Sequence, residues 1–231
     1  MSRRVAVALV VAALVAGCAR TVSGDAVRQA GDDVSAVPPL SEVHLGDVLV
    51  DIDELNSIVG SVGMVVTSDV GVMTDHSGDV SDPGCVGAVY GAEETVYEGS
   101  GWTVVRDQVA REPGEDNQHW VEQTVVLYPS EDEARAFVAA ARAMWEECAR
   151  AGLVVDDGVV RSLWDMASVV DDGPLLTQMS VQRDAGGWGC QHAMSAASNL
   201  VVETWACAFA PGTEAAAIAA QMVDNAAEAA G

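Results

Sequence analysis

The sequence contains no lysine, and its 11 arginines face 35 aspartates and glutamates, which gives a formal net charge of −24 at pH 7 over 231 residues. Phosphate binding needs a basic face, so this balance excludes nucleic acid as a partner. It also excludes electrostatic attachment to anionic lipid. The acidic residues are instead typical of a solvated surface that keeps a protein soluble.

Long hydrophobic runs are equally scarce, since Val5–Val15 is the single long uncharged apolar stretch. This stretch is shorter than the roughly 20 residues that span a bilayer, so we expect no transmembrane helix. It follows Arg3 and Arg4 and leads into small residues, and this combination indicates a secretory signal. The letters VAGC, which end at Cys18, have the form of a lipobox and predict cleavage before that cysteine.

The expected domain organisation follows from this signal. We predict that residues 1–17 are removed as a lipoprotein signal peptide and that Cys18 carries a diacylglycerol, a palmitate-type anchor. Two acyl chains hold a protein stably where one is marginal, so we expect the chain at the extracytoplasmic face of the cell membrane. Residues 18–45 lack a sustained period and predict a lipidated N-terminus with a flexible tether. Residues 46–231 are then the folded domain.

The strand pattern of that domain predicts an α+β fold, in which helices pack against an antiparallel β-sheet. Residues 102–111 and 119–128 read as a hairpin, and the intervening EPGEDN supplies the turn chemistry. Two more strands are expected over 159–169 and 175–183, joined by a turn at Asp-Asp-Gly. No internal repeat is evident, and the length fits one domain with a flexible lead, or at most two small domains.

The helix signals complete this picture. Asp51 or Asp53 is expected to cap a short helix whose apolar face is the set Leu55, Ile58, Val59 and Val62. Ser130 and Glu133 form a capping box in front of a strongly periodic helix that reaches Cys148. Thr213 is expected to cap a last, alanine-rich helix.

The hairpin register places a polar pair inside an otherwise apolar face. Centring the register on the turn sets Arg106 near Gln123 on the face that we expect to be buried. The other face then sets Asp107 near Glu122, an arrangement tolerable only in water. Arg106 either buries its stem while its guanidinium reaches the surface, or lines a ligand cleft.

Four cysteines remain after Cys18, and they allow three disulfide pairings. Cys190 and Cys207 are symmetric about Ser198-Asn199, where a two-residue turn would make them a non-hydrogen-bonded strand pair. Such pairs approach closely enough for a disulfide. The expected bridges are therefore Cys190–Cys207 and, with the two cysteines that are left, Cys85–Cys148.

The alternatives to disulfides are a metal site or a cysteine nucleophile. The spacing of Cys190, His192 and His119 matches no zinc pattern, and the aspartates of residues 74–84 match no calcium loop. An oxidising compartment would pair a free thiol. The sequence also lacks the common hydrolase motifs, so we expect no metal, no cofactor and no enzyme.

Three segments together are similar to a known family. They are SDPGCVGAVYG at 81–91, the stretch from GWTVVRDQVAR to MWEECA at 101–149, and GCQHAMSAASNLVVETWAC at 189–207. They resemble the mycobacterial PknH-like extracellular sensor domain, over roughly residues 50–225. The resemblance implies an α+β domain with a ligand cleft and pairing of first with second and third with fourth cysteine. It agrees with the bridges expected above.

These observations favour a lipid-anchored, non-catalytic sensor that binds an unidentified small ligand. The candidate cleft residues are Arg106, Gln123, Trp120 and Gln191. The alternative is an envelope protein-interaction module that presents its acidic surface to a protein partner. A less favoured hypothesis is a hydrolase, which would need His119 or His192 beside a carboxylate and a hydroxyl.

Overall fold

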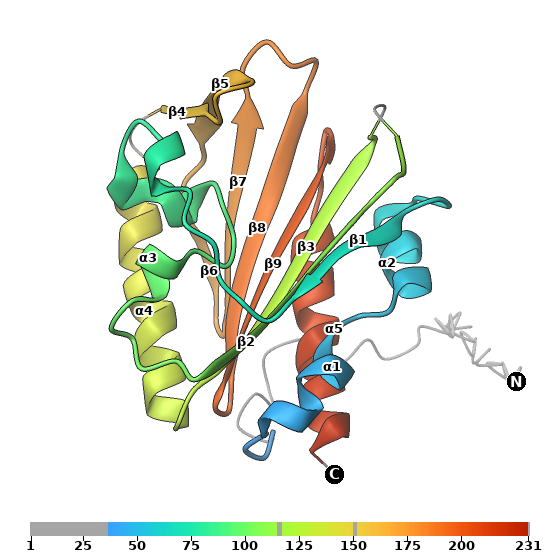
Figure 1. Cartoon of the computed structure of the whole chain (residues 1–231), viewed down its shortest axis with the longest axis vertical. Coiled ribbons are helices and arrows are strands. Elements are labelled where there is room, and N and C mark those ends of the chain that lie inside the picture. The colour runs from blue at the N-terminus through green and yellow to red at the C-terminus, as the bar shows by residue number, and fades with distance from the viewer. Residues whose placement is uncertain (1–36, 115–116, 150–151, 231) are drawn as a thin grey trace, which may run out of the picture.

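One antiparallel sheet organises the computed structural model, which describes residues 37–114, 117–149 and 152–230 (Figure 1). The strand order is β1-β2-β3-β9-β8-β7-β5-β4, and β6 pairs with β7. The strands are β1 (Val65–Val70), β2 (Val104–Arg111), β3 (His119–Leu127), β4 (Leu153–Asp156), β5 (Arg161–Met166), β6 (Val170–Asp172), β7 (Leu175–Gln182), β8 (Trp188–Ala197) and β9 (Leu200–Phe209). The helices are α1 (Leu45–Val48), α2 (Ile52–Val59), α3 (Glu94–Tyr97), α4 (Glu131–Cys148) and α5 (Glu214–Ala229). The predicted α+β class is confirmed.

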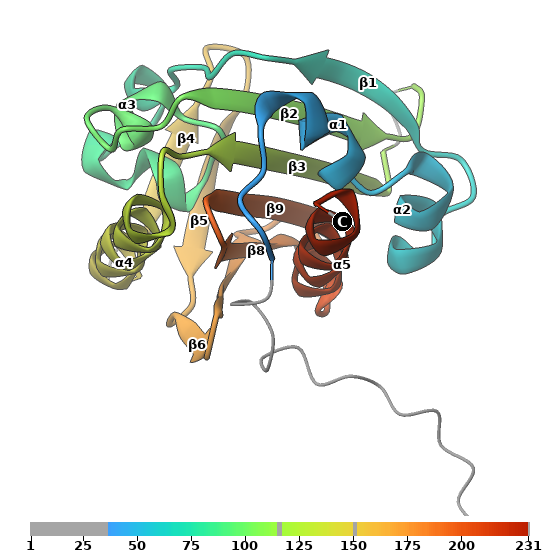
Figure 2. The same ribbon diagram turned by 90° about the horizontal axis from the view of Figure 1, so that it is seen from below.

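Two long helices cover opposite faces of the same central strands. Both α4 and α5 contact β8 and β9, and Figure 2 shows α4 and α3 on one side of the sheet and α5, α1 and α2 on the other. The expected helix starts are both found. Ser130 accepts a hydrogen bond from the backbone N–H of Glu133 at 3.3 Å, whereas the Thr213 side chain makes no capping hydrogen bond. The central strands are therefore buried on both faces.

The short helix α2 begins and ends for identifiable local reasons. The Asp51 carboxylate accepts from the backbone N–H groups of Asp53 and Glu54, both at 2.9 Å, as an N-cap should. Gly60 follows the helix with a left-handed φ of 75° and ends it. Val62 consequently lies beyond the helix and is fully exposed, so its predicted place on the apolar face is wrong.

The folded domain starts earlier than the sequence indicates. Val37 and Leu40 are buried, and residues 42–44 form a short 3-10 turn. The backbone of Leu40 exchanges two hydrogen bonds with the side-chain amide of Asn199, at 2.8 and 3.0 Å. Residues 37–45, assigned above to the tether, therefore pack on the domain. Cys18 and the predicted signal peptide lie outside the described residues.

The β8–β9 hairpin has the predicted register throughout. Ala197 pairs with Leu200, and Cys190 pairs with Cys207 across a disulfide with Cα atoms 4.0 Å apart. The left-handed turn residue is Ser198, with φ of 52°, while Asn199 uses its side chain to bind neighbouring backbone. The expected symmetry is confirmed, although the asparagine contributes hydrogen bonds rather than a left-handed backbone.

The β2–β3 hairpin differs from its predicted register by two residues. Arg106 lies opposite Val125, and Gln108 takes the place opposite Gln123. A two-residue shift leaves each side chain on its expected face. The expectation that the Asp107 face lies in water is nevertheless wrong, because helices cover both faces of the sheet and Asp107 is only 6% exposed.

The second predicted disulfide joins α4 to the 3-10 segment Pro83–Ala88. Cys85 and Cys148 are bridged with Cα atoms 5.6 Å apart. Beside the bridge, the Trp145 indole donates a hydrogen bond to the carbonyl of Gly87 at 3.0 Å. A Cβ added at Gly87 would lie 2.8 Å from the methyl end of the Met144 side chain, so this segment packs closely on α4. Within the described residues, no helix is long and apolar enough to cross a membrane.

Candidate functional site

The four candidate cleft residues do not converge on one cavity. Gln123 and Gln191 lie on the α5 face and are used by the fold itself. Gln123 bonds both the N–H and the carbonyl of Val50, at 2.8 and 2.9 Å, and Gln191 accepts from the N–H of Ala216 at 3.0 Å. Both amides have structural partners, which accounts for their burial.

Arg106 lies near the edge of the sheet and reaches the surface. Its guanidinium donates to both carboxylate oxygens of Asp69 at 3.0 and 2.9 Å, and its side chain is 42% exposed. The Gln108 amide also donates to Asp69, at 3.2 Å, and accepts from Gln123. Arg106 is thus a surface-reaching arginine with a fixed acidic partner.

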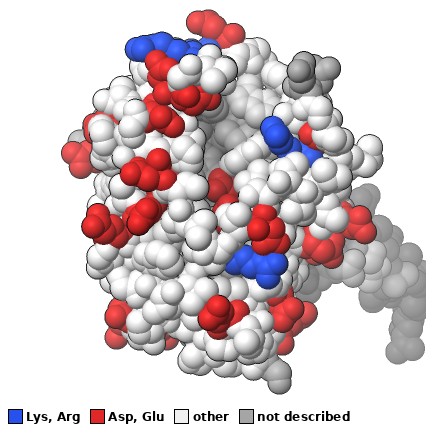
Figure 3. All heavy atoms as spheres, viewed as in Figure 1, with Lys and Arg blue, Asp and Glu red and all other residues white. Residues whose placement is uncertain are grey.

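Trp120 lies on the opposite face, in an aromatic cluster beside the β8–β9 disulfide. Trp205 is buried against that bridge, and Trp120, Trp164 and Trp188 pack partly buried around it. Figure 3 shows the surface hollowed over the same end of β8 and β9, between the α3 side and β3. Of the four candidates, Trp120 alone lies in this aromatic cluster.

Deeper on this face, a buried histidine belongs to a chain of polar side chains. His192 Nε2 lies 2.8 Å from a Glu203 oxygen, and the Tyr97 hydroxyl donates to the other Glu203 oxygen at 2.7 Å. The His192 ring is sandwiched between Trp145 and Trp205, with centroids 4.0 and 3.9 Å away. Burial lowers the pKa of His192, while Glu203 acts against the decrease, and the imidazole is neutral at pH 7.

Two further carboxyl groups on this face have raised pKa values. Burial raises the pKa of Glu122 well above its usual range, and the charges of Asp107 and Glu203 add to the rise. Burial also raises the pKa of Asp107, although hydrogen bonds from Thr124, at 2.6 Å, and from Glu122 oppose it. Two like charges in one buried site disfavour double ionisation, so this environment favours the protonated form of Glu122.

Four unpartnered polar atoms lie in two adjacent rows of the same face. Gln178 pairs with His192 and His192 with Trp205 across β7, β8 and β9, and Ser180 lies in the next row. Gln178 Oε1, His192 Nδ1, Trp205 Nε1 and Ser180 Oγ are all buried without a hydrogen-bond partner among the described residues. An unsatisfied buried polar atom costs about 1–3 kcal/mol, so such a concentration requires an explanation.

His119 and His192 each contact a carboxylate rather than a hydroxyl. In both His119–Glu112–Ser61 and His192–Glu203–Tyr97, the carboxylate sits between the imidazole and the hydroxyl. A general base must itself contact the hydroxyl that it deprotonates. Among the described residues, no group of three or more potential metal ligands is found either.

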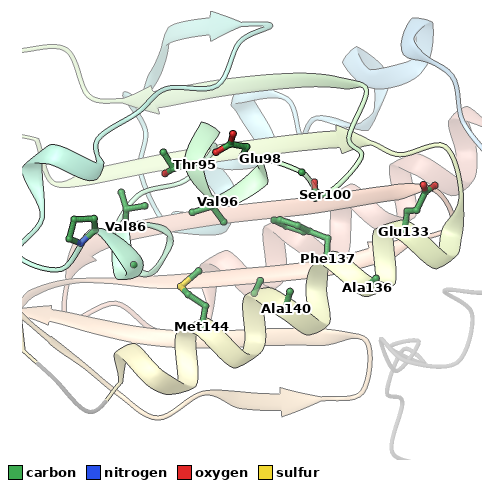
Figure 4. A pocket seen from close by; sticks show the side chains of 14 residues that line it. Val86, Thr95, Val96, Glu98, Ser100, Glu133, Ala136, Phe137, Ala140 and Met144 are labelled. Carbon is green, nitrogen blue, oxygen red and sulfur yellow. The ribbon is translucent and has the colours of Figure 1, made fainter.

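A separate groove lies between α4, α3 and the segment Pro83–Ala88, with a volume of about 590 Å³. Figure 4 shows Met144 and Val86 toward one end and Glu133 toward the other, with Phe137 between them. The sequence pattern predicts a periodic helix that reaches Cys148 and no groove beside it. The missed signal is the pair Ala136 and Ala140, exposed on the turns of α4 beside Phe137.

Comparison with known proteins finds relatives over most of the chain. Residues 40–225 match the family described as PknH-like extracellular domain. The serine/threonine-protein kinase PknH of Mycobacterium bovis is 36% identical over 187 residues, which are 81% of this chain and 31% of that protein. The Mycobacterium tuberculosis PknH is also 36% identical, over 30% of its length. The chain thus spans less than a third of these relatives.

A solved structure shows the same architecture. The crystal structure of the extracellular domain of PknH from Mycobacterium tuberculosis superposes with a TM-score of 0.79 at 35% sequence identity. The match covers 83% of this chain and 99% of that one. The resemblance expected from the three sequence segments is therefore confirmed at the level of fold.

Proposed function

The chain belongs to the PknH-like extracellular domain family, and from this premise we propose that it is a lipid-anchored extracytoplasmic sensor that binds a small ligand on the α4 face of its sheet. The single observation that supports the site is the group of four unpartnered polar atoms in adjacent strands. A ligand that enters the hollow among the tryptophans and reaches these atoms would satisfy them. Among the described residues, the buried polar set on the sheet includes carboxyl groups and no arginine, which favours a ligand without a negative charge.

The decisive experiment is native mass spectrometry of the protein purified from its own envelope. We expect a retained small molecule, and we expect Trp120→Ala to lose it. Trp102→Ala is the matched control, because Trp102 is also a half-buried tryptophan but packs in the core under α4. Ligand-free protein in every preparation, or equal retention in both variants, would overturn the proposed site.

The lipid anchor is tested independently of the ligand. Cys18→Ala should release the protein from the membrane fraction or leave it with an uncleaved signal. Membrane partitioning of this variant that matches the unaltered chain would defeat the anchor.

A second candidate function, binding of a protein partner, is favoured by the edge of the sheet. The edge strand β1 exposes Val65, Val66 and Val70, and Val72 is exposed just beyond it. Exposed apolar edge strands are sites where another chain can pair. Crosslinking from Val66 replaced by a photoreactive residue would capture such a partner, whereas a crosslinker on the Trp120 side would not.

A further inference from the structure

We propose that the groove between α3, Pro83–Ala88 and α4 is a second binding site, and that it takes a single-chain amphiphile with a cationic head group. The groove is distinct from the site on the sheet, since none of its lining residues belongs to a strand. The proposal therefore stands or falls without the function proposed above.

The groove stays open because short side chains face it along α4. Ala136 and Ala140 line it on successive turns and leave the space opposite Thr95 and Val96 unfilled. Elsewhere the walls pack closely, since the Trp145 indole lies 3.0 Å from the Gly87 carbonyl oxygen and a Cβ added at Gly87 would lie 2.8 Å from the side-chain ends of Met144 and Val96. Closing the groove by moving the walls together is thus blocked by contact that already exists.

The walls are also fixed covalently. The Cys85–Cys148 disulfide ties Pro83–Ala88 to the end of α4, and the hydrogen bond from Trp145 to the Gly87 carbonyl reinforces it. A preformed groove binds without the entropic cost of ordering its walls.

The shape and lining of the groove suit a linear apolar chain. Its floor is formed by Val86, Val96, Phe137 and Met144. The lining extends along α4 from Glu133 to Met144, which at 1.5 Å per residue is about 16 Å. Its volume lies in the range of small-molecule sites. An extended chain fills such a groove better than a compact ring.

The charged residues of the groove determine which head group of an amphiphile is attracted. Glu98 and Glu133 line it, and the lining contains no arginine or histidine. The arginines of α4 are engaged elsewhere, Arg135 with Glu131 and Arg142 with Glu146 and Asp171. Among the described residues, no cation forms an ion pair with Glu98 or Glu133. An ammonium head is attracted here, whereas a sulfate or carboxylate head is repelled.

The test uses the chain from residue 18 onward with Cys18→Ser, titrated below micelle concentrations with dodecyltrimethylammonium. Isothermal titration calorimetry gives the affinity, and the methyl resonance of isotopically labelled Met144 reports the place of binding. We expect saturable binding with a shifted Met144 signal, and dodecyl sulfate weaker by at least about tenfold. Equal binding of the two detergents, or a Met144 signal that does not move, would overturn the proposal.

Variants separate the groove from the rest of the surface. Ala140→Trp should fill the groove and weaken the ammonium probe at least about tenfold, while Ala139→Trp, exposed on the same helix outside the groove, should leave it within about twofold. The double variant Glu98→Gln and Glu133→Gln should weaken the probe about fivefold. Equal losses in the two tryptophan variants would contradict the proposal. Trp120→Ala should not affect this probe, which keeps the two sites distinguishable.

Discussion

On its α5 face, β3 presents Val121 and Val125 to an aliphatic core, whereas on its α4 face the same strand presents Glu122 and Thr124 to other polar groups. Both sets are buried almost completely. The α5 face gains stability from apolar area removed from water, at about 25 cal/mol per Å². Where the α4 face buries polar side chains, it gains less stability from burial. The hydrogen bonds of these side chains largely replace hydrogen bonds to water.

The two disulfides also lie on one side of the sheet, the side of α4. Both disulfides have their sulfur atoms in the clusters of the α4 face, and the core cluster of the α5 face contains no cysteine among its described residues. A face that carries buried carboxyl groups and unpartnered atoms needs another source of stability. The sheet therefore has an aliphatic core under α5, whereas its α4 face combines an apolar cluster with rows of buried polar groups, and both cross-links lie on that face.

The largest expected effect comes from removing a cross-link of the α4 face. Replacing Cys85 and Cys148 together by alanine opens a loop with a sequence separation of 63 and should lower the free energy of unfolding by about 4 kcal/mol. The same change at Cys190 and Cys207, with a separation of 17, should cost about 3 kcal/mol. Urea denaturation measures both. A larger loss for the shorter loop would show that chain entropy does not govern these bridges.

Truncating the α5 face comes next. Ile218 is fully buried in the aliphatic core, so Ile218→Ala should lower the free energy of unfolding by about 3 kcal/mol, measured in urea. Val223→Ala, on the partly buried side of the same helix, is the control and should cost about 1 kcal/mol. Similar losses for both variants would mean that burial in the aliphatic core is not the main source of stability on the α5 face.

The polar α4 face should also make the stability of the protein depend on pH. The folded-state pKa of Glu122 is raised, so its contribution to stability is fully present below the ordinary glutamate pKa and is lost as pH rises toward the folded value. Stability should fall with pH in that window, by at most about 1.4 kcal/mol per pH unit for one proton. Glu122→Gln should remove this fall in thermal denaturation scans. A variant with an unchanged pH profile would refute the protonated carboxyl.

The smallest effect is expected at the sheet edge, outside both faces. Arg106→Gln breaks an ion pair whose two side chains are both more than a third exposed, so the loss should be below about 1 kcal/mol. Thermal denaturation at low and high salt measures it. A loss comparable to that of Ile218→Ala would indicate that Arg106 supports the core.

Local signals in the sequence predicted the elements that depend on local chemistry. The caps at Asp51 and Ser130 and the symmetric turn between Cys190 and Cys207 all appear as expected, because neighbouring residues alone determine them. Residues 159–169, expected as one strand, form the shorter strand β5, and β6 begins at Val170 and occupies part of the expected Asp-Asp-Gly turn. The register of β2 on β3 was off by two residues because the long turn does not fix the pairing.

The candidate site was less predictable, for a physical reason. When helices cover both faces of a sheet, alternation of polar and apolar residues no longer separates buried from exposed positions. The sequence pattern therefore predicts that Asp107 and Glu122 face solvent. In the structure both are buried, and burial raises the pKa of each. The unpartnered atoms of Gln178, His192 and Trp205 become visible only when three strands are aligned.

The amide of Asn199 has a mechanical consequence. It holds the backbone of Leu40 at the start of the domain and the carbonyl of Tyr128 at the end of β3, from the tip of the β8–β9 hairpin. A force applied at Val37 would therefore reach the central hairpin through this side chain as well as through the buried side chains of Val37 and Leu40. Asn199 therefore links the first described residues of the domain to the turn of its central hairpin and to the chain after β3.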